Sequence, residues 1–393
     1  MIDEAKRKAI VVLEHCVRPV GFFASGLPGG YEAVWARDSM IASLGASLLG
    51  KKFQIPFRKS LELLGKNQGE FGQTPNAIGS YNVERGSDVT FNAIDANLWY
   101  IIGHHVYKKT YNDNSLYSRY RPSLKKALTW LKFQDPNNDS LIVQQPTSDW
   151  QDAFPHKYGR AISTQALYYV ALKFEGEKKR AEKLKKIVNG EIEKYLSLYD
   201  AKLGYYRPWR WKTHNKFEEG EYWFDTFGNL MAIVTGLTTP KIAKSILVYI
   251  DKQKINRPYP CKAIYPPIKR GDKEWQEYFE DCEAREPYAY LNGGIWPFIG
   301  GFYVAALVKV GEFNKAESEL AKLAEANKLY ANLPTDFITN KLKNLKTNFW
   351  GFQEWLHGQT GKPAGGSNPY QAWSAGMYVY AYECVKRKKV FYF

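Results

Sequence analysis

The sequence has few cysteines and no long apolar run. Its four cysteines, Cys16, Cys261, Cys282 and Cys384, are scattered and form no CxxC pair, which argues against a disulfide scaffold and favours a reduced, cytoplasmic protein. No apolar stretch approaches the roughly 20 residues that a membrane-spanning helix needs. The first residues, MIDEAKRK, are charged, unlike a signal peptide. We therefore expect no membrane association.

Linkers, low-complexity tracts and breaks in composition are also absent from the sequence. Hydrophobic residues make up 45% of the chain and aromatic residues 16%, which is enough for a sizeable core. We predict a single domain over residues 1–393. No cluster of His, Cys, Asp and Glu has the spacing of a metal site, so we expect neither a metal nor a cofactor.

Basic residues outnumber acidic ones and give a formal net charge of +15. Such a charge raises the question of a nucleic-acid or acidic-polymer partner. The basic residues, however, gather mainly at 178–186 and 386–389, on segments that we expect to be exposed helix faces. No nucleic-acid-binding motif is present. We predict no nucleic-acid partner and leave the oligomeric state open.

The chain does contain a regular alternation of helices and long loops. Apolar residues at helical spacing predict helices at 2–17, 37–50, 52–66, 91–110, 114–134, 160–174, 177–195, 222–236, 239–252, 294–310, 312–328 and 368–386. Between successive pairs run loops of roughly 20 to 40 residues, far longer than the usual 4 to 6, at 18–36, 67–90, 135–159, 196–221, 253–293 and 329–367. This rhythm predicts an all-α (α/α)6 toroid of six inner and six outer helices, with the long loops forming a cleft on one face.

Most of the tryptophans lie in these loops or early in the helices that follow. Broad flat rings at one end of a barrel suit stacking against sugar rings, although they could also simply hold the loops down. We expect the rings of Trp35, Trp99, Trp296 and Trp355 to face one shared pocket, and Trp150 and Trp373 are further substrate-binding candidates.

The first long loop places a cation and an anion beside Trp35. Arg37 and Asp38 can clamp two neighbouring sugar hydroxyls, because one donates hydrogen bonds and the other accepts them. The alternative is that Asp38 or Ser39 caps the helix. Capping alone would not require Arg37.

Two other loops carry similar polar candidates. Asp95 and Trp99 are four residues apart on one helical face, where they could offer an acceptor and a stacking surface. Asn292 precedes the glycine pair 293–294, which lets backbone approach a ligand.

The third loop holds the candidate general acid. Asp152 lies between Trp150 and Phe154, and desolvation by such neighbours raises a carboxyl pKa toward the value that a general acid needs. We therefore expect Asp152 in the less polar setting of the catalytic pair. Asp149 is the rival candidate.

The sixth loop holds the candidate general base. Glu354 is a lone carboxylate among four aromatic residues, and it could activate water opposite Asp152 if the two carboxyls stand about 6.5–9.5 Å apart. The alternative is a buried Glu354 held by Arg37 or Gln371.

These loops together resemble a known family. The segments YPPI, YLNGGIWP, QEW, TGK and QAWS are similar to alkaline/neutral invertases, at 265–268, 290–297, 353–355, 360–362 and 371–374. The segments VWARDSMI at 34–41 and WQDA at 150–153 are closer to the amylo-α-1,6-glucosidase domain of glycogen debranching enzymes. The chain thus resembles the inverting (α/α)6-barrel glycoside hydrolases. It departs from invertases at 163–165, where they place a Glu and this chain has STQ.

The resemblance implies an inverting hydrolase with Asp152 as general acid and Glu354 as general base. The expected substrate is a small α-glucosidic carbohydrate, either an α-gluco-oligosaccharide or sucrose. The subsite for the non-reducing sugar would contain Arg37, Asp38, Asp95, Trp99 and Gln371, and Arg160 and Gln165 are further binding candidates at the start of the next helix.

Three other functions remain open on the same barrel. A sugar epimerase would need a pair of cleft histidines, drawn from His156, His214 and His357. A polysaccharide lyase could use the positive charge and the tyrosines Tyr81, Tyr158 and Tyr288. The third is a sugar-binding protein without catalytic activity.

Overall fold

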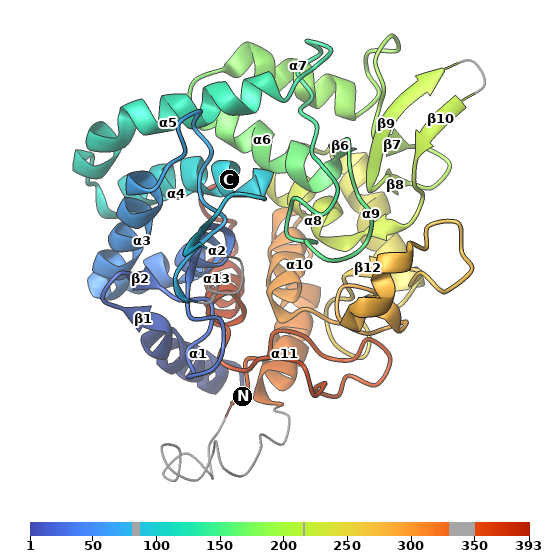
Figure 1. The fold of residues 1–393 in the computed structure, drawn as a ribbon. Helices are drawn as coiled ribbons and strands as arrows, with labels where there is room; N and C mark the ends of the chain where they lie inside the picture. Colours follow the sequence, from blue (N-terminus) through green and yellow to red (C-terminus); the bar gives the residue numbers. More distant parts are fainter. Residues whose placement is uncertain (81–86, 215–216, 330–349) are drawn as a thin grey trace.

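The computed structural model describes residues 1–80, 87–214, 217–329 and 350–393. Each predicted helix has a counterpart there (Figure 1). One set is buried around almost its whole circumference: α2 (Ala36–Ala46), α4 (Ile94–Tyr111), α6 (Ile162–Phe174), α8 (Thr226–Thr235), α10 (Pro297–Lys309) and α13 (Ala372–Arg387). The other set buries one face only: α1 (Ile2–Cys16), α3 (Gln54–Lys66), α5 (Ser115–Phe133), α7 (Lys178–Val188), α9 (Pro240–Lys252) and α11 (Phe313–Lys328).

The buried helices contact one another in a closed cycle. α2 contacts α4, α4 contacts α6, and the series continues through α8, α10 and α13 back to α2. Figure 1 shows these six helices around a common centre. The half-exposed helices pack against them from outside, where α5 lies on α4, α7 on α6 and α11 on α10. Helices that are apolar all round are buried, whereas amphipathic ones keep a polar face in water.

The cycle closes where the first and last hairpins meet. A Cβ atom on Gly45 of α2 would lie 1.8 Å from the carbonyl oxygen of Gly376 in α13, so only glycine permits this approach. The outer helix α1 also packs on α13, and the Lys6 ammonium lies 2.7 Å from the Glu383 carboxylate. The two ends of the chain therefore join the ring.

The long loops contain short antiparallel strands that the helical pattern did not predict. Within the described ranges they form five small sheets, β1–β2, β3–β4–β5, β6–β9–β10, β7–β8 and β11–β12. Their bounds are β1 Val17–Arg18, β2 Gly21–Phe22, β3 Val34–Trp35, β4 Ala77–Ile78, β5 Val89–Thr90, β6 Arg160–Ala161, β7 Tyr199–Asp200, β8 Tyr205–Tyr206, β9 Trp209–His214, β10 Phe217–Gly220, β11 Phe224–Asp225 and β12 Ile264–Tyr265. The 3₁₀ helices are η1 Ser47–Phe53, η3 Glu277–Asp281 and η4 Glu283–Arg285.

Several helix ends differ from the predicted ones for local reasons. α8 begins at Thr226 because β11 occupies the two preceding residues, and Asp225 caps the helix by accepting a 2.9 Å hydrogen bond from the Gly228 amide. α7 ends at Val188 because Gly190 adopts a φ of +78°, a left-handed conformation that ends helices. Within the described residues, no helix combines the length and apolarity needed to cross a membrane.

Candidate active site

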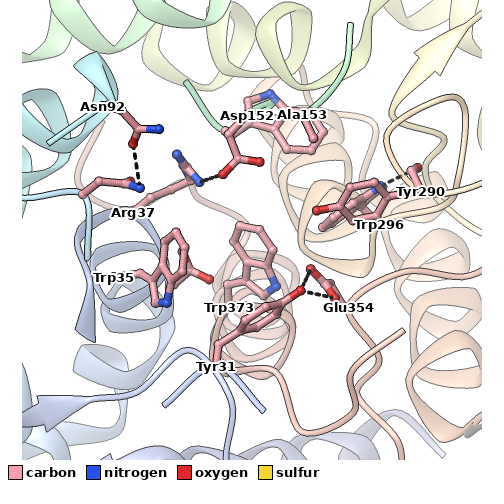
Figure 2. A pocket seen from close by; sticks show the side chains of 13 residues that line it. Tyr31, Trp35, Arg37, Asn92, Asp152, Ala153, Tyr290, Trp296, Glu354 and Trp373 are labelled. Carbon is pink, nitrogen blue, oxygen red and sulfur yellow. Dashed lines mark hydrogen bonds and ion pairs between the residues drawn. The ribbon is translucent and has the colours of Figure 1, made fainter. Parts of the chain in front are cut away.

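A cavity of about 230 Å³ lies at the N-terminal ends of the buried helices (Figure 2). Thirteen residues line it, and they come from five of the six long loops or from the helix starts that follow. The segments 135–159 and 329–367 both contribute, through Asp152 and Glu354. These two loops therefore meet at one cavity, as predicted, through Asp152 and Glu354.

An aromatic cluster forms one wall of the cavity. The rings of Phe298 and Trp373 are stacked with centroids 4.3 Å apart, and Trp150 packs edge-on against Trp296 at 5.6 Å. The Trp296 indole N–H donates a 3.0 Å hydrogen bond to the Tyr290 carbonyl. The wall is thus a fixed apolar surface of the kind that suits the C–H face of a sugar ring.

Arg37 lies in the first turn of α2 with its guanidinium buried. Its Nε donates to the Asp95 carboxylate at 2.7 Å, and one terminal nitrogen donates to the Asp149 carbonyl at 3.0 Å. The other terminal nitrogen lies 3.9 Å from the Asp152 carboxylate. A buried charge needs such partners to offset its desolvation. Asp95 itself does not line the cavity, so its observed contact is with Arg37 rather than with the cavity.

Asp38, the next residue, does line the cavity. Burial raises the pKa of its carboxyl to about 7, although Arg37 opposes that shift. Within the described part of the chain, no other side chain hydrogen-bonds to the Asp38 carboxyl. The helix begins after Trp35 without a side-chain cap, and the Ser39 hydroxyl donates to the Trp35 carbonyl. The capping role is therefore wrong for both Asp38 and Ser39, and Asp38 is available to bind a hydroxyl group.

Asp152 faces the cavity with about a third of its side chain exposed, 32%. Burial by the cavity walls raises the pKa of its carboxyl, Arg37 lowers it, and the nearby Asp95 and Asp149 carboxylates raise it again. The balance is a pKa above the usual range. A carboxyl group in this state can carry a proton into the cavity.

Glu354 sits across the cavity from Asp152 in a more enclosed position (Figure 2). The Tyr31 hydroxyl lies 3.2 Å from both of its carboxylate oxygens and donates to them. Burial nevertheless raises the pKa of Glu354 to about 8. The expectation that Asp152 would have the less polar setting is therefore wrong, because Asp152 has a guanidinium beside it and Glu354 does not. The partner of Glu354 is Tyr31, not Arg37 or Gln371.

Asp149 has a different environment from Asp152. It is buried, it does not line the cavity, and its carboxylate lies 2.7 Å from the Lys157 ammonium. Burial alone would raise its pKa, but Lys157 outweighs burial and holds the pKa below its usual range. Such a carboxylate holds no proton near neutrality, so Asp149 does not suit the role of general acid.

Two of the expected stacking residues lie elsewhere. The Trp99 ring is fully buried in the hydrophobic core, and Trp355 is buried against Tyr290 with ring centroids 6.0 Å apart. Neither lines the cavity, whereas Trp35, Trp150, Trp296 and Trp373 do. The prediction that Trp99 and Trp355 face the shared pocket is therefore wrong. Helical spacing indicates which face of the helix carries Trp99, but not how deeply its ring is buried.

Four polar candidates also lie outside the cavity lining. The Gln165 amide pairs with the backbone of Ile142, and the Asn292 amide pairs with the backbone of Ile268. Arg160 lies 2.7 Å from Asp139 in a second cavity. Gln371 is buried at the N-cap position of α13, and its amide atoms have no hydrogen-bond partner among the described residues. Their direct contact with a sugar is therefore not supported by the geometry.

The cavity also contains residues that sequence reasoning missed. Tyr31, Asn76, Asn92 and Tyr290 line it, and the Asn76 amide donates to the Asn92 side chain at 3.2 Å. The only sequence signal for them was their place in a long loop just before a buried helix. The buried Lys157 had no signal, because a lysine in a loop normally indicates a solvated surface.

Of the residues that an epimerase or a lyase would need, those whose side chains the structure describes do not line the cavity. Among the described residues, His156 contacts Tyr278 and His357 accepts hydrogen bonds from its own loop, and neither lines it. The Tyr158 hydroxyl bonds to Glu219, and Tyr288 is not in the lining either. Tyr81 and the side chain of His214 lie outside the described residues. Within the described ranges, no group of three His, Cys, Asp or Glu residues could hold a metal ion.

The chain is similar in sequence to one protein family and to several plant enzymes. A family model described as amylo-alpha-1,6-glucosidase matches residues 18–379. The probable alkaline/neutral invertase A of Arabidopsis thaliana, a chloroplastic protein, is 22% identical over 88% of the chain and 66% of its own length. The probable alkaline/neutral invertase F of the same plant is 25% identical over 61% of the chain and 57% of its length. The chain thus spans about two thirds or less of the length of each of these relatives.

Solved structures share the fold at low sequence identity. The GH63 mannosylglycerate hydrolase of Thermus thermophilus superimposes with a TM-score of 0.64 at 14% identity, over 95% of this chain and 99% of that one. The rhamnosidase of Klebsiella oxytoca gives a TM-score of 0.61 at 13% identity, over 98% of this chain and 64% of that one. At these identities the likeness shows the arrangement of helices alone.

Proposed function

The chain belongs to the amylo-alpha-1,6-glucosidase family and is a glycoside hydrolase, and on that premise we propose that it cleaves a small, uncharged α-glucoside with inversion at the anomeric carbon. The observation that carries the proposal is the pair Asp152 and Glu354 on the walls of one aromatic cavity. We also propose that the closed cycle of buried helices is the inner wall of an (α/α)6 toroid, with the cavity in a cleft at one end.

The reaction needs one acid and one base. Protonated Asp152 donates its proton to the glycosidic oxygen while the bond from C1 to that oxygen breaks, and the bonding electrons stay with the leaving oxygen. Glu354 as carboxylate takes a proton from a water molecule, whose oxygen bonds to C1 from the opposite face. The products are a reducing sugar, with a hydroxyl group on C1, and the protonated leaving group, and the two carboxyl groups have exchanged protonation states. A proton shuttle through solvent restores them.

The roles of the two carboxyls follow from the resemblance, and the hydrogen bond from Tyr31 supports them. A hydroxyl group that donates to Glu354 stabilises the ionised form, which is the form that a base needs. The pKa of about 8 at Glu354 means that this form becomes dominant only on the alkaline side. We therefore expect the kcat/KM–pH profile to have a limb near pH 8, where Glu354 changes its charge.

The size and charge of the cavity support a short, neutral substrate. Its volume of about 230 Å³ is below the usual range of about 300–1,000 Å³ for ligand sites, so it suits one sugar ring. Among the described lining residues, three are acidic (Asp38, Asp152 and Glu354) and one is basic (Arg37), and Arg37 is already paired with Asp95. An anionic leaving group such as the glycerate of mannosylglycerate, the substrate named for the GH63 neighbour, would meet these carboxylates. The same charges disfavour the acidic polymer that a lyase would bind.

The cysteines support a reducing compartment such as the cytoplasm. All four are unpaired thiols, and three of them are buried. Burial raises the pKa of the Cys16 thiol above its usual range, and a thiol in that state is inert.

A panel of glycosides tests the proposed function. Purified protein is incubated with sucrose, trehalose, isomaltose, maltose and glucosylglycerate, and released monosaccharide is measured. We expect at least one neutral disaccharide to be cleaved and glucosylglycerate to be the poorest substrate. Binding without release of sugar would identify a non-catalytic sugar-binding protein, and efficient cleavage of glucosylglycerate alone would contradict the charge argument.

A further inference from the structure

A lysine buried behind the cavity has no place in the mechanism above. Lys157 is 0% exposed, in a loop, although lysine is among the residues least often fully buried. Its ammonium lies 2.7 Å from the Asp149 carboxylate and 3.4 Å from that of Asp225, and it donates to the Gln151 side-chain oxygen at 2.6 Å. The Ser163 hydroxyl lies at 3.4 Å as well, so two carboxylates, one amide oxygen and one hydroxyl surround its three N–H groups.

The contacts of Lys157 connect the Asp152 loop to a buried helix. Asp225 caps α8 and is held there by the Gly228 amide. Asp149 and Gln151 lie in the loop, three residues and one residue before Asp152. The Asp149 carboxylate also accepts a 2.9 Å hydrogen bond from the Gln151 backbone amide, which fixes the turn that leads to Asp152. Lys157 thus ties this turn to the N-terminus of α8.

A second connection leads from the same turn to the other side of Asp152. The Asp149 carbonyl accepts the 3.0 Å hydrogen bond from Arg37, whose guanidinium lies 3.9 Å from the Asp152 carboxylate. Among the described residues, no side chain hydrogen-bonds to Asp152 itself. The direction of its carboxyl group therefore depends on its backbone and on Arg37. Asp149 contacts both of them, through the Gln151 amide and through the Arg37 guanidinium, which Asp95 also holds.

We infer that Lys157 is a positioning residue for the general acid Asp152, acting through Asp149 and Gln151. This inference rests on the proposed function, because it assumes that Asp152 protonates the leaving group. Burial opposes the charge on Lys157, but Asp149 and Asp225 outweigh burial and raise its pKa, so the ammonium remains charged. If Lys157 only stabilised the fold, its loss would affect reactions that need the acid and reactions that do not need it to the same extent. A positioning role would affect mainly the reactions that need the acid, and this difference can be measured.

The test compares two substrates with different leaving groups in Lys157→Met. The first is the disaccharide that the panel identifies, whose alkoxide leaving group needs a proton. The second is α-glucosyl fluoride, whose fluoride leaves without one. We expect kcat/KM for the disaccharide to fall about 10²-fold, as for a misplaced catalytic group, and kcat/KM for the fluoride to stay within about threefold, because the acid contributes little there.

A second variant covers the case in which Lys157→Met does not fold, since that change leaves two buried carboxylates without their cation. Gln151→Met keeps every charge and removes one contact of Lys157. We expect the disaccharide activity again to fall more than the fluoride activity, but by only about tenfold, because one of the four side-chain contacts of Lys157 is gone. The matched control is Arg180→Met, which removes a cation that lies 2.6 Å from Asp135 at the start of the same loop and should leave the ratio of the two activities unchanged.

The outcomes separate the inference from the proposed function. If wild-type protein cleaves neither substrate, the proposed function fails and the inference fails with it. If wild-type protein cleaves both and Asp152→Asn retains only the fluoride activity, the proposed function stands. Equal losses on the two substrates in folded Lys157→Met or Gln151→Met, or no loss in either variant, would then overturn the positioning role alone.

Discussion

The two carboxyl groups that lie across the cavity from each other, those of Asp152 and Glu354, have different surroundings. Asp152 has the Arg37 guanidinium at 3.9 Å and a third of its side chain exposed, whereas Glu354 is enclosed and accepts a hydrogen bond from Tyr31. Both have raised pKa values. The two groups therefore have separate environments that can be altered one at a time.

The first prediction separates the acid from the base. Asp152→Asn should lose about 10²–10⁴ of kcat/KM on a disaccharide and retain most activity on α-glucosyl fluoride, which needs no acid. Glu354→Gln should lose both activities to a similar extent, and azide, a nucleophile that needs no base, should restore turnover of the fluoride. Steady-state kinetics on the two substrates would show the reverse pattern if the roles were exchanged. If Asp149→Asn alone lost the disaccharide activity, Asp149 would be the acid.

The second prediction concerns pH. The Tyr31 hydroxyl stabilises ionised Glu354, so Tyr31→Phe should raise the pKa of Glu354 above its value of about 8. The ionised base then forms at higher pH, and the limb of the kcat/KM–pH profile that reports Glu354 should move in the alkaline direction. At pH 7 we expect about tenfold lower kcat/KM, the equivalent of one hydrogen bond to a charged group.

A matched control is available on the protein surface. Tyr278→Phe removes a hydroxyl that lies 3.0 Å from His156, outside the cavity lining, and should leave the pH profile in place. A Tyr31→Phe profile that superimposes on that of the wild type would show that Tyr31 does not tune Glu354.

Helices and loops were predictable to different degrees. The helices followed from the spacing of apolar residues, and even their burial could be inferred, because α10 is apolar all round and α9 has one apolar stripe. Inside the loops no such period exists. Trp355 directly follows Glu354 yet does not line the cavity, and its ring packs against Tyr290 instead. Contacts between distant loops, such as Tyr31 with Glu354, decide which side chains enter the cavity, and local sequence carries no record of them.

The third prediction concerns the contact between α2 and α13. A Cβ atom on Gly376 would lie 2.5 Å from the Ala42 Cα and carbonyl oxygen, so Gly376→Ala must push the two helices apart. We expect the free energy of unfolding to fall by about 1–3 kcal/mol, as in other overpacked cores, measured by urea denaturation. Activity should fall as well, because α2 carries Arg37 and Asp38. Gly365→Ala is the control, since its Cβ would meet nothing within 4 Å; equal stability of the two variants would contradict the close packing.

For the whole molecule, the net charge is positive, whereas the described lining of the cavity is mainly acidic. The net charge of +15 includes outer-helix lysines such as Lys178 and Lys179 on α7, whereas the cavity holds three carboxyls and one paired guanidinium. The surface charge therefore does not describe the substrate. What the fold provides instead is a cavity at the N-terminal ends of the buried helices, where five loops bring Asp152, Glu354 and an aromatic wall together.

The stereochemistry of hydrolysis tests this arrangement most directly. Wild-type protein is mixed with the α-glucoside that the panel identifies, and ¹H NMR spectra are recorded before mutarotation proceeds. If Glu354 activates a water opposite the bond that Asp152 protonates, the first glucose to appear is the β-anomer. If the α-anomer appears first, water has not attacked in one inverting step, and the assignment of Asp152 and Glu354 as acid and base is contradicted.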